Sequence, residues 1–348
     1  MKLINSTTMA SHKHHISYAL TLSFLSISLI LLIITLFFLC RKKPPKKKES
    51  ISTTKLCVQN FSLSEIDIAT DRFNPSRIIG KGRLGTTYAA VFDDKDDLVV
   101  VKRIHPWLVL SKVGLGSFQA MIKSLSLAQH PNIVPILGFL EAPGERMIIM
   151  EYVGTMSLDF YLHQNIDGPS LLGWVQRVSI AAGMARGLEY LHEKMAPQVV
   201  HGCIKPTNVL VDVNFCAKFC DYGLSFLAAK QEKMGVLGYV DEEFWLERNK
   251  SSGACKESDV YGFGVVLLEL LTGRTSEGGL LVRWVLPLIK EMKFNEFLDA
   301  RIKMPTNMKP IVRLAKVALA CVGNSRKTRP KISQIVCILD NLDMNIGL

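Results

Sequence analysis

A long uncharged run near the N-terminus constrains this chain most. Residues 16–40 contain no Asp, Glu, Lys or Arg over 25 positions. As a helix, the run would extend about 37 Å, which exceeds a bilayer core of about 30 Å. We therefore expect a single transmembrane helix over residues 16–40. A cleaved signal peptide is the alternative, but its apolar region is usually only about 7 to 15 residues long.

Basic residues follow this run directly. Residues 41–48 hold six Lys and Arg, whereas only Lys2 and Lys13 precede the run. Because basic flanks stay in the cytoplasm, we expect a single-pass membrane protein, at the plasma membrane, with a cytoplasmic C-terminal domain. The basic cluster is also expected to contact anionic lipid. The expected segments are a short external tail (1–15), the helix (16–40), a basic juxtamembrane linker (41–60) and a folded domain (61–348).

The net charge of +11 is concentrated at the N-terminus. The first 50 residues carry eight Lys and Arg against one Glu, and the remaining 298 carry 34 against 30. The near-neutral body gives no reason to expect a nucleic-acid partner. Eight cysteines without a C-x-x-C pair do not form a disulfide framework, which fits a reducing compartment.

The sequence pattern after the basic segment changes from strand-like to helical along the chain. Residues 78–155 contain short runs rich in β-branched residues, interrupted by one helical window at 117–128. A β-rich part followed by a helical part predicts an α+β arrangement with a cleft between two lobes. The expected helices of the second part cover residues 175–194, 258–271, 280–292, 310–322 and 332–342.

Two motifs in the first part are weak when taken singly. The pattern G-x-G-x-x-G at Gly80, Gly82 and Gly85 lets a backbone approach phosphate oxygens, but a plain hairpin is the commoner explanation. Lys102 follows in a valine-rich strand, where an edge-strand lysine is the simpler interpretation. Their order along the chain gives each motif more weight.

The later motifs make the combination specific. The segment His201-Gly-Cys-Ile-Lys-Pro-Thr-Asn208 is followed by Asp221-Tyr-Gly and by Asp259-Val-Tyr-Gly-Phe-Gly. Over residues 61–345 the chain resembles the protein-kinase superfamily, and most closely the plant receptor-like kinase branch. The resemblance implies a bilobal fold, with a β-rich N-lobe at about 73–155 and a helical C-lobe at about 156–345.

The resemblance also implies a nucleotide site for ATP and Mg²⁺. Lys102 would hold the phosphates, Asn208 and Asp221 would ligate the metal, and Lys205 would lie near the transferred phosphate. The implied nucleotide-binding residues are Ile79, Gly80, Lys81, Gly82, Gly85, Thr87, Val100, Lys102, Met150 and Leu210.

The chain departs from the family pattern where chemistry is done. Cys203 occupies the position of the catalytic aspartate, and a thiol that is mostly protonated at neutral pH is a poor base. Met121 occupies the position of the helix glutamate that pairs with Lys102, and residues 111–140 contain no acid at all. No catalytic residue set is therefore intact. The larger Val100 and the hydroxyl of Thr87 also alter the adenine side.

The scaffold positions of the family are retained. Leu125, Leu137, His201 and Tyr222 are expected to form the apolar column that links the lobes. Glu243 is expected to form a buried bridge with Arg329, while Gly202 replaces the arginine that would clamp a phosphorylated loop.

These features favour one function and leave two open. We expect a degenerate, pseudokinase-like protein that acts as a scaffold or allosteric partner of an active receptor-like kinase. The alternatives are a weak or atypical Ser/Thr kinase, and a switch that senses ATP without turnover. A test of phosphate transfer distinguishes the weak kinase from the other two. Stabilisation by Mg²⁺-ATP without transfer distinguishes the ATP-sensing switch from the scaffold.

Overall fold

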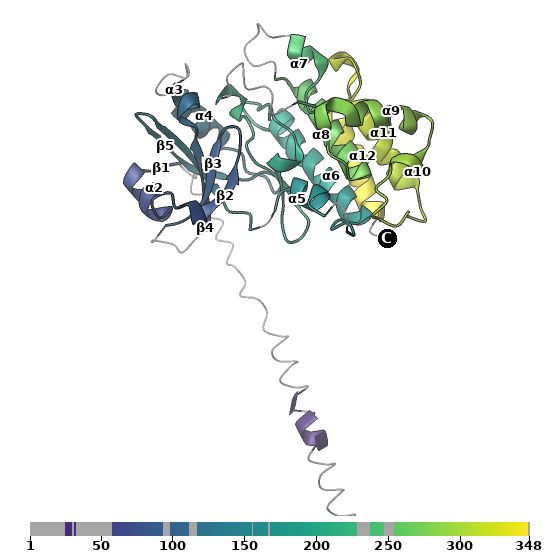
Figure 1. The fold of residues 1–348 in the computed structure, drawn as a ribbon, viewed down its shortest axis with the longest axis horizontal. Coiled ribbons are helices and arrows are strands. Elements are labelled where there is room, and N and C mark those ends of the chain that lie inside the picture. The colour runs from purple at the N-terminus through teal and green to yellow at the C-terminus, as the bar shows by residue number, and fades with distance from the viewer. Residues whose placement is uncertain are drawn as a thin grey trace, which may run out of the picture. The chain divides into compact units, whose positions relative to one another are not determined.

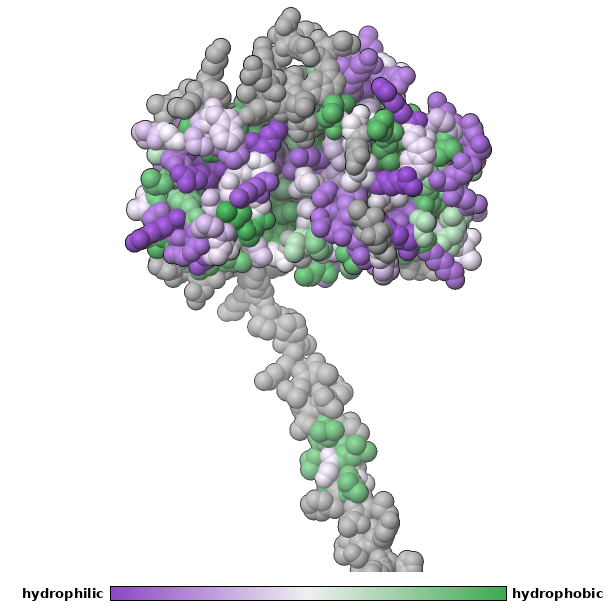
Figure 2. Space-filling model, viewed as in Figure 1, coloured by the Kyte–Doolittle hydropathy of each residue, from purple (hydrophilic) through white to green (hydrophobic). Residues whose placement is uncertain are grey.

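The computed structural model divides the chain into two compact units, Met1–Leu56 and Cys57–Leu348. In the first unit, residues 25–29 and 31–32 are helical and exposed, and most of this segment is hydrophobic (Figure 2). Among the described residues, no helix is both long and apolar enough to cross a membrane. Most of the predicted span, 16–40, lies outside them and stays a prediction. The described residues are 25–29, 31–32, 58–92, 98–110, 117–154, 156–165, 168–227, 237–246 and 254–346.

The N-lobe of the second unit is built on a six-stranded sheet of order β1-β5-β6-β4-β3-β2 (Figure 1). All neighbouring strands are antiparallel except β1, which runs parallel to β5 at the sheet edge. β-Branched side chains suit these half-buried pleated strands. The strands are β1 (Gln59–Asn60), β2 (Ile78–Lys81), β3 (Gly85–Val91), β4 (Leu98–Ile104), β5 (Ile136–Ala142) and β6 (Glu145–Glu151).

Short helices surround this sheet. Helix α2 (Leu63–Ala69) begins at a capping box in which the Ser62 side chain and Glu65 satisfy each other's backbone N–H groups. Its residues Ile66 and Ala69 join Val99, Val101 and other buried side chains in a cluster of their own. Helices α3 (Pro106–Leu110) and α4 (Ser117–Leu125) follow β4. Strand β1 lies in the stretch that the sequence predicts as linker, because pairing with β5 orders two polar residues.

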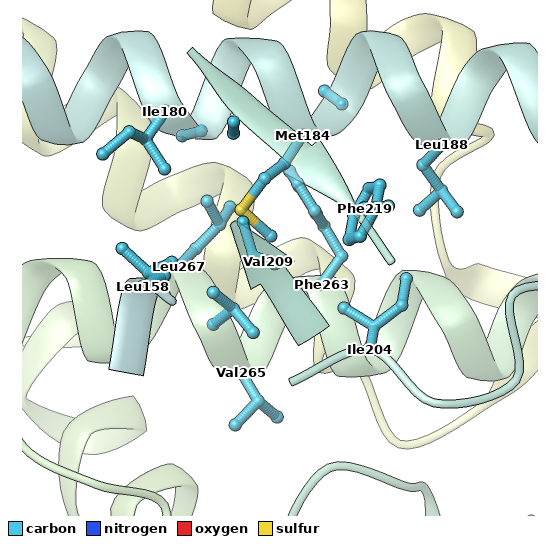
Figure 3. Close-up of a cluster of buried hydrophobic side chains, with 14 of the residues drawn as sticks. Leu158, Ile180, Met184, Leu188, Ile204, Val209, Phe219, Phe263, Val265 and Leu267 are labelled. Atoms are coloured by element: carbon cyan, nitrogen blue, oxygen red, sulfur yellow. The ribbon is translucent and has the colours of Figure 1, made fainter. Parts of the chain in front are cut away.

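The C-lobe is helical around one deeply buried helix, α8 (Figure 1). Its apolar residue Phe263 lies toward Met184 and Phe219 in the core, whereas Val265 points away from them on the other side of the helix (Figure 3). A small sheet of β7 (Val209–Val211) and β8 (Ala217–Phe219) carries the loops of the candidate site. The helices are α5 (Leu158–His163), α6 (Trp174–Glu189), α7 (Glu242–Leu246), α8 (Lys256–Thr272), α9 (Leu280–Lys290), α10 (Phe294–Phe297), α11 (Lys309–Cys321) and α12 (Ile332–Ile346).

The predicted bilobal α+β fold is confirmed, with one correction to its core. Leu137 does not belong to the column that links the lobes, because it packs with the cluster beneath α2. Its neighbour Ile136 is buried in the main cluster, together with Leu125 and Tyr222. Successive strand residues point to opposite faces, so the prediction placed the column one residue too far along the strand.

Candidate active site

The glycine-rich hairpin joins β2 to β3, and its three glycines are not equivalent. A Cβ added to Gly85 would lie 2.0 Å from the carbonyl oxygen of Arg103 on β4. Gly80 and Gly82 would meet nothing closer than 3.9 Å. Only Gly85 is therefore required by close approach of the backbone.

Lys102 and Asp221 form a direct ion pair across the two lobes. Lys102 lies near the end of β4, and Asp221 follows β8 with a left-handed φ of +60°. The Lys102 ammonium donates to Asp221 Oδ2, and both side chains are mostly buried. Asp221 Oδ1 is buried without a hydrogen-bond partner among the described residues. A buried carboxylate oxygen of this kind is available to a hard cation.

Helix α4 offers no acid to Lys102. Met121, at the position predicted for the glutamate, is exposed on the helix surface. The helix is held from another side, because Gln119 N at its first turn donates to Glu141 Oε2 on β5. Glu141 also faces Arg146 on β6, with 3.4 Å between Oε1 and Nε. A carboxylate at a helix N-terminus complements the helix dipole.

The catalytic loop is held by Asp259 at the start of α8. Asp259 accepts hydrogen bonds from the backbone N–H groups of His201 (2.7 Å) and Gly202 (2.8 Å). It also lies 2.9 Å from Nε2 of His192. Burial lowers the pKa of His201, whose ring meets Phe219 edge to face. The loop backbone therefore has the fixed geometry that a catalytic loop needs.

Cys203 projects from this rigid loop at the position of the base. Burial raises the pKa of its thiol, and the nearby cations Lys205 and Arg83 do not overcome that effect. A thiol with a raised pKa stays protonated at neutral pH and cannot accept a proton from a hydroxyl substrate. The loop thus presents a neutral, weakly basic group where phosphoryl transfer needs a carboxylate.

Gly202 excludes a side chain at the position of the family's arginine. Its φ is +78°, and an added Cβ would lie 2.7 Å from Cβ and Oγ of Ser225. Ser225, the second residue after the Asp221-Tyr-Gly segment, therefore occupies the space beside the loop. The adjacent pocket is lined by small and aromatic residues of the loop and of the segment before α8, including Gly202, Cys203, Tyr239 and Phe244.

The residues present fit a magnesium ion. Asn208 is buried, and its side-chain Nδ2 donates to Cys203 O at 2.9 Å, which leaves Oδ1 as the ligating atom. The backbone of Cys220 donates to Asn208 O, so β7 and β8 hold Asn208 near Asp221. These two side chains would hold Mg²⁺, which would neutralise charge on nucleotide phosphates.

The remaining predicted nucleotide residues lie on the sheet and on β7. Val100 is opposite Met150 of β6 and Ala89 of β3, and Thr87 is opposite Lys102. Leu210 is half-buried on β7. Ile79 and Lys81 are exposed on β2, and Lys205 precedes the turn that carries Asn208. Their roles in binding stay predictions.

The buried bridge to Arg329 involves a different acid from the one predicted. Arg329 Nη1 donates to Asp241 Oδ2 at 2.7 Å, and both side chains are almost fully buried. Asp241 also faces Arg326 at 3.0 Å. Glu243 is half-exposed, and its side chain accepts from Arg326 N at 3.1 Å. Asp241 lies closer to the core because it precedes α7, whereas Glu243 lies within that helix.

Sequence reasoning missed the buried acid Asp241 and the cross-strand pair of Glu141 with Arg146. Asp241 gave no signal of its own, because it heads three consecutive acids at 241–243. Glu141 and Arg146 face each other across the hairpin of β5 and β6, one pair away from its turn, and their antiparallel register brings them together. Opposite charges across strands could have indicated that pair.

Comparison with known proteins assigns the family. Residues 73–339 match the family described as protein tyrosine and serine/threonine kinase. The match spans most of the chain, so the chain belongs to this protein-kinase family.

Several of its curated relatives come from Arabidopsis thaliana. Phytosulfokine receptor 1 is 34% identical over 297 residues, which cover 82% of this chain and 29% of that receptor. The probable serine/threonine-protein kinase PBL6 is 33% identical, with 82% and 69% of the two chains covered. The proline-rich receptor-like protein kinase PERK5 is 35% identical, with 82% and 43% covered. The predicted kinship with plant receptor-like kinases is confirmed, although the chain spans less than a third of the first relative.

A solved structure extends the similarity. The pseudokinase domain of BIR2, described as an immune regulator of the RLK/Pelle family, superposes with a TM-score of 0.70 and 32% identity. The superposition covers 82% of this chain and 87% of that domain. The match supports the kinase fold throughout the second unit.

Proposed function

We propose that this chain is a membrane-anchored pseudokinase that serves as a scaffold or allosteric partner of an active receptor-like kinase. The observation that carries the proposal is the half-buried Cys203 thiol, whose pKa is raised by desolvation, in a catalytic loop that Asp259 holds in place. Loss of a positioned general base typically costs about 10²- to 10⁴-fold in rate. The similarity to the BIR2 pseudokinase domain supports the same conclusion.

Two further features oppose catalysis. Lys102 pairs with Asp221 instead of a helix acid, so the lysine that would hold phosphates is bound to the predicted metal ligand. Gly202 and Ser225 leave no room for the arginine that would bind a phosphorylated activation segment. Both changes affect positioning and charge neutralisation, on which phosphoryl transfer chiefly depends.

The membrane anchor rests on the sequence. The uncharged run at 16–40 and the six cations of residues 41–48 favour a single span with the kinase-like domain in the cytoplasm. We expect the full chain to resist extraction from membranes by alkaline carbonate and to be released by detergent. Release by carbonate alone would contradict the anchor but not the pseudokinase assignment.

Phosphate transfer tests the catalytic part of the proposal. We would incubate the full-length chain in lipid nanodiscs with radiolabelled ATP and Mg²⁺, with and without a generic protein substrate. We expect the wild type to stay at the background set by Lys102→Ala and Asp221→Asn. Label that appears in the wild type and disappears in both variants would overturn the proposal and favour a weak kinase.

The weak-kinase alternative keeps one specific observation in its favour. Lys102, Lys205, Asn208 and Asp221 are all present, and Asp221 Oδ1 has no hydrogen-bond partner in the part of the chain that the structure describes. Cys203→Asp is therefore an informative variant, because it adds only the missing carboxylate. Transfer that rises above background in this variant would show that the nucleotide machinery is otherwise competent.

The sensing alternative is separated by ligand stabilisation. A ligand that binds only the folded state at about 100 times its Kd stabilises that state by about 2.7 kcal/mol. Mg²⁺-ATP that raises the unfolding temperature without label transfer would favour an ATP-sensing switch. An unchanged unfolding temperature would favour a scaffold that acts without nucleotide.

A further inference from the structure

The tip of the glycine-rich hairpin is fastened to the chain that follows β4. The backbone N–H of His105 donates to Leu84 O at 3.0 Å. The imidazole Nε2 of the same residue lies 3.0 Å from Gly82 O. A carbonyl oxygen only accepts, so Nε2 carries the proton and donates. One histidine thus bonds two carbonyls of the loop.

Trp107 fixes the orientation of this histidine. The two rings stack with centroids 4.0 Å apart and planes 13° from parallel. Trp107 is otherwise largely exposed on α3. Aromatic stacking adds stabilisation beyond burial of area. The exposed indole therefore has a local role, because it covers one face of the imidazole.

Two more contacts hold the same loop. Leu84 at the tip is buried in the main core cluster, which also contains Ile104, Leu108 and Phe118. Gly82 N donates to Gly85 O at 2.9 Å, which makes the turn tight. The tip is therefore closed on itself and embedded in the lobe.

We propose that His105 and Trp107 form a clasp that holds the glycine-rich loop in a single closed position. The clasp makes His105 a positioning residue for the nucleotide site, and Trp107 its support. A nucleotide must then enter beneath a loop that does not open. A loop of this kind suits a scaffold, which does not need to exchange nucleotide in each catalytic cycle.

The suggested role of the closed loop rests on the proposed function. The contacts of His105 and Trp107 with the loop can be tested without nucleotide. Removal of either ring is therefore the perturbation that we expect to open the loop.

Hydrogen exchange of the hairpin tests this proposal. The full-length chain in nanodiscs would be compared with His105→Ala and Trp107→Ala by mass spectrometry of fragments that cover residues 78–92. We expect both variants to exchange the hairpin amides about tenfold faster, the change expected from one hydrogen bond or one aromatic pair. Trp107→Phe keeps a ring against the imidazole and is expected to stay near the wild type.

His130→Ala is the matched control. His130 also stacks on an aromatic ring, Tyr190 at 4.9 Å, and its Nδ1 accepts from Asn132 N, but it makes no bond to the glycine-rich loop. It should leave hairpin exchange unchanged. Unaltered hairpin exchange in both clasp variants, with an unchanged unfolding temperature, would overturn the clasp and leave the pseudokinase proposal unaffected. Equal acceleration in all three variants would also overturn it, because the effect would then be general loosening.

Discussion

Gly202 shows how the backbone at a single residue can oppose the side chain that the family carries at that position. Its φ of +78° lies in the region where other residues are strained by about 1 to 2 kcal/mol. An added Cβ would also press on the Ser225 side chain. We predict that Gly202→Ala lowers the free energy of unfolding by about 1 to 3 kcal/mol, measured by thermal unfolding. The family's arginine could therefore not simply be reinstated here.

Gly80→Ala is the control at the same scale. Its added Cβ would make only an ordinary contact, 3.9 Å from Thr87 Cβ, so we expect a change within about 0.5 kcal/mol. Adding Ser225→Gly to Gly202→Ala should recover the part of the cost that comes from contact, but not the backbone strain. Equal effects of Gly202→Ala and Gly80→Ala would contradict the argument.

At the scale of the element, helix α4 is positioned by the sheet and not by Lys102. Glu141 accepts from the first turn of the helix and faces Arg146, with side-chain exposures of 8% and 4%. Removing one partner of a buried pair costs about 3 to 5 kcal/mol. We predict that Glu141→Ala destabilises the domain by about 3 kcal/mol and accelerates hydrogen exchange in Ser117–Leu125.

Glu145→Ala provides a comparison within the same hairpin. Glu145 pairs with Arg103, but that pair is more open to water, with exposures of 19% and 35%. Exposed pairs contribute at most about 1 kcal/mol. If Glu145→Ala cost as much as Glu141→Ala, or if α4 exchanged normally in the latter, the sheet would not be what holds the helix.

A buried carboxyl on helix α8 predicts a pH dependence. Glu269 accepts from Tyr239 Oη at 2.6 Å and from Ser276 N at 2.8 Å, and its Oε2 lies 3.6 Å from Nε2 of His163. Burial outweighs these contacts and raises the pKa of Glu269 from 4.5 to about 7. Between these pH values the folded state keeps a proton that the unfolded state has released. Stability from this group therefore falls as the pH rises through that window.

The raised pKa of Glu269 also sets the size of this loss of stability. We predict a loss of up to about 3 kcal/mol between pH 4.5 and 7 that is absent in Glu269→Gln, whose amide does not ionise. Thermal unfolding of both proteins over this range measures the difference, since other titrating groups are common to both. Parallel pH profiles would show that Glu269 ionises normally in the folded protein.

At the scale of the whole molecule, helices and strands could be predicted well from the sequence, whereas contacts between distant residues could not. The long helices and valine-rich strands follow from their hydrophobic patterns. Strand β1 exists only because β5 pairs with it, so no local pattern marks it. Ile136 and Leu137 are both apolar, and only the cover provided by α2 decides which faces the main core. Asp241, and not Glu243, pairs with Arg329 because α7 begins after Asp241, and the sequence alone does not fix that start.

The candidate site shows the same division. Its residue types were readable as a set, since their order matches a family, but the sequence left open whether Lys102 pairs with Asp221 or with phosphate. Lys102 and Asp221 are 119 positions apart, and only the closed arrangement of the lobes brings them together. The glycine-rich motif gave no sign that His105 would bond its tip, because histidine and indole carry no pattern there.

The Lys102–Asp221 pair also ties the two lobes together. The pair is mostly buried, with side-chain exposures of 9% and 14%, and each partner alone would be a charge left in a poorly solvated site. We predict that Lys102→Met and Asp221→Asn each cost about 3 kcal/mol in unfolding free energy, while the double variant costs well below their sum. Asn suits position 221 because it tolerates a left-handed φ.

This double-mutant cycle needs a reference ion pair that does not join the two lobes. Arg186 and Asp340 join α6 to α12 with exposures of 38% and 37%, so their coupling should stay below about 1 kcal/mol. Additive effects at Lys102 and Asp221 would mean that the two charges are solvated separately and that the lobes are held by apolar packing alone. Strong coupling would mean that a ligand which draws Lys102 or Asp221 away must compensate for the broken tie. Nucleotide would then act on this protein chiefly by changing how its lobes are joined.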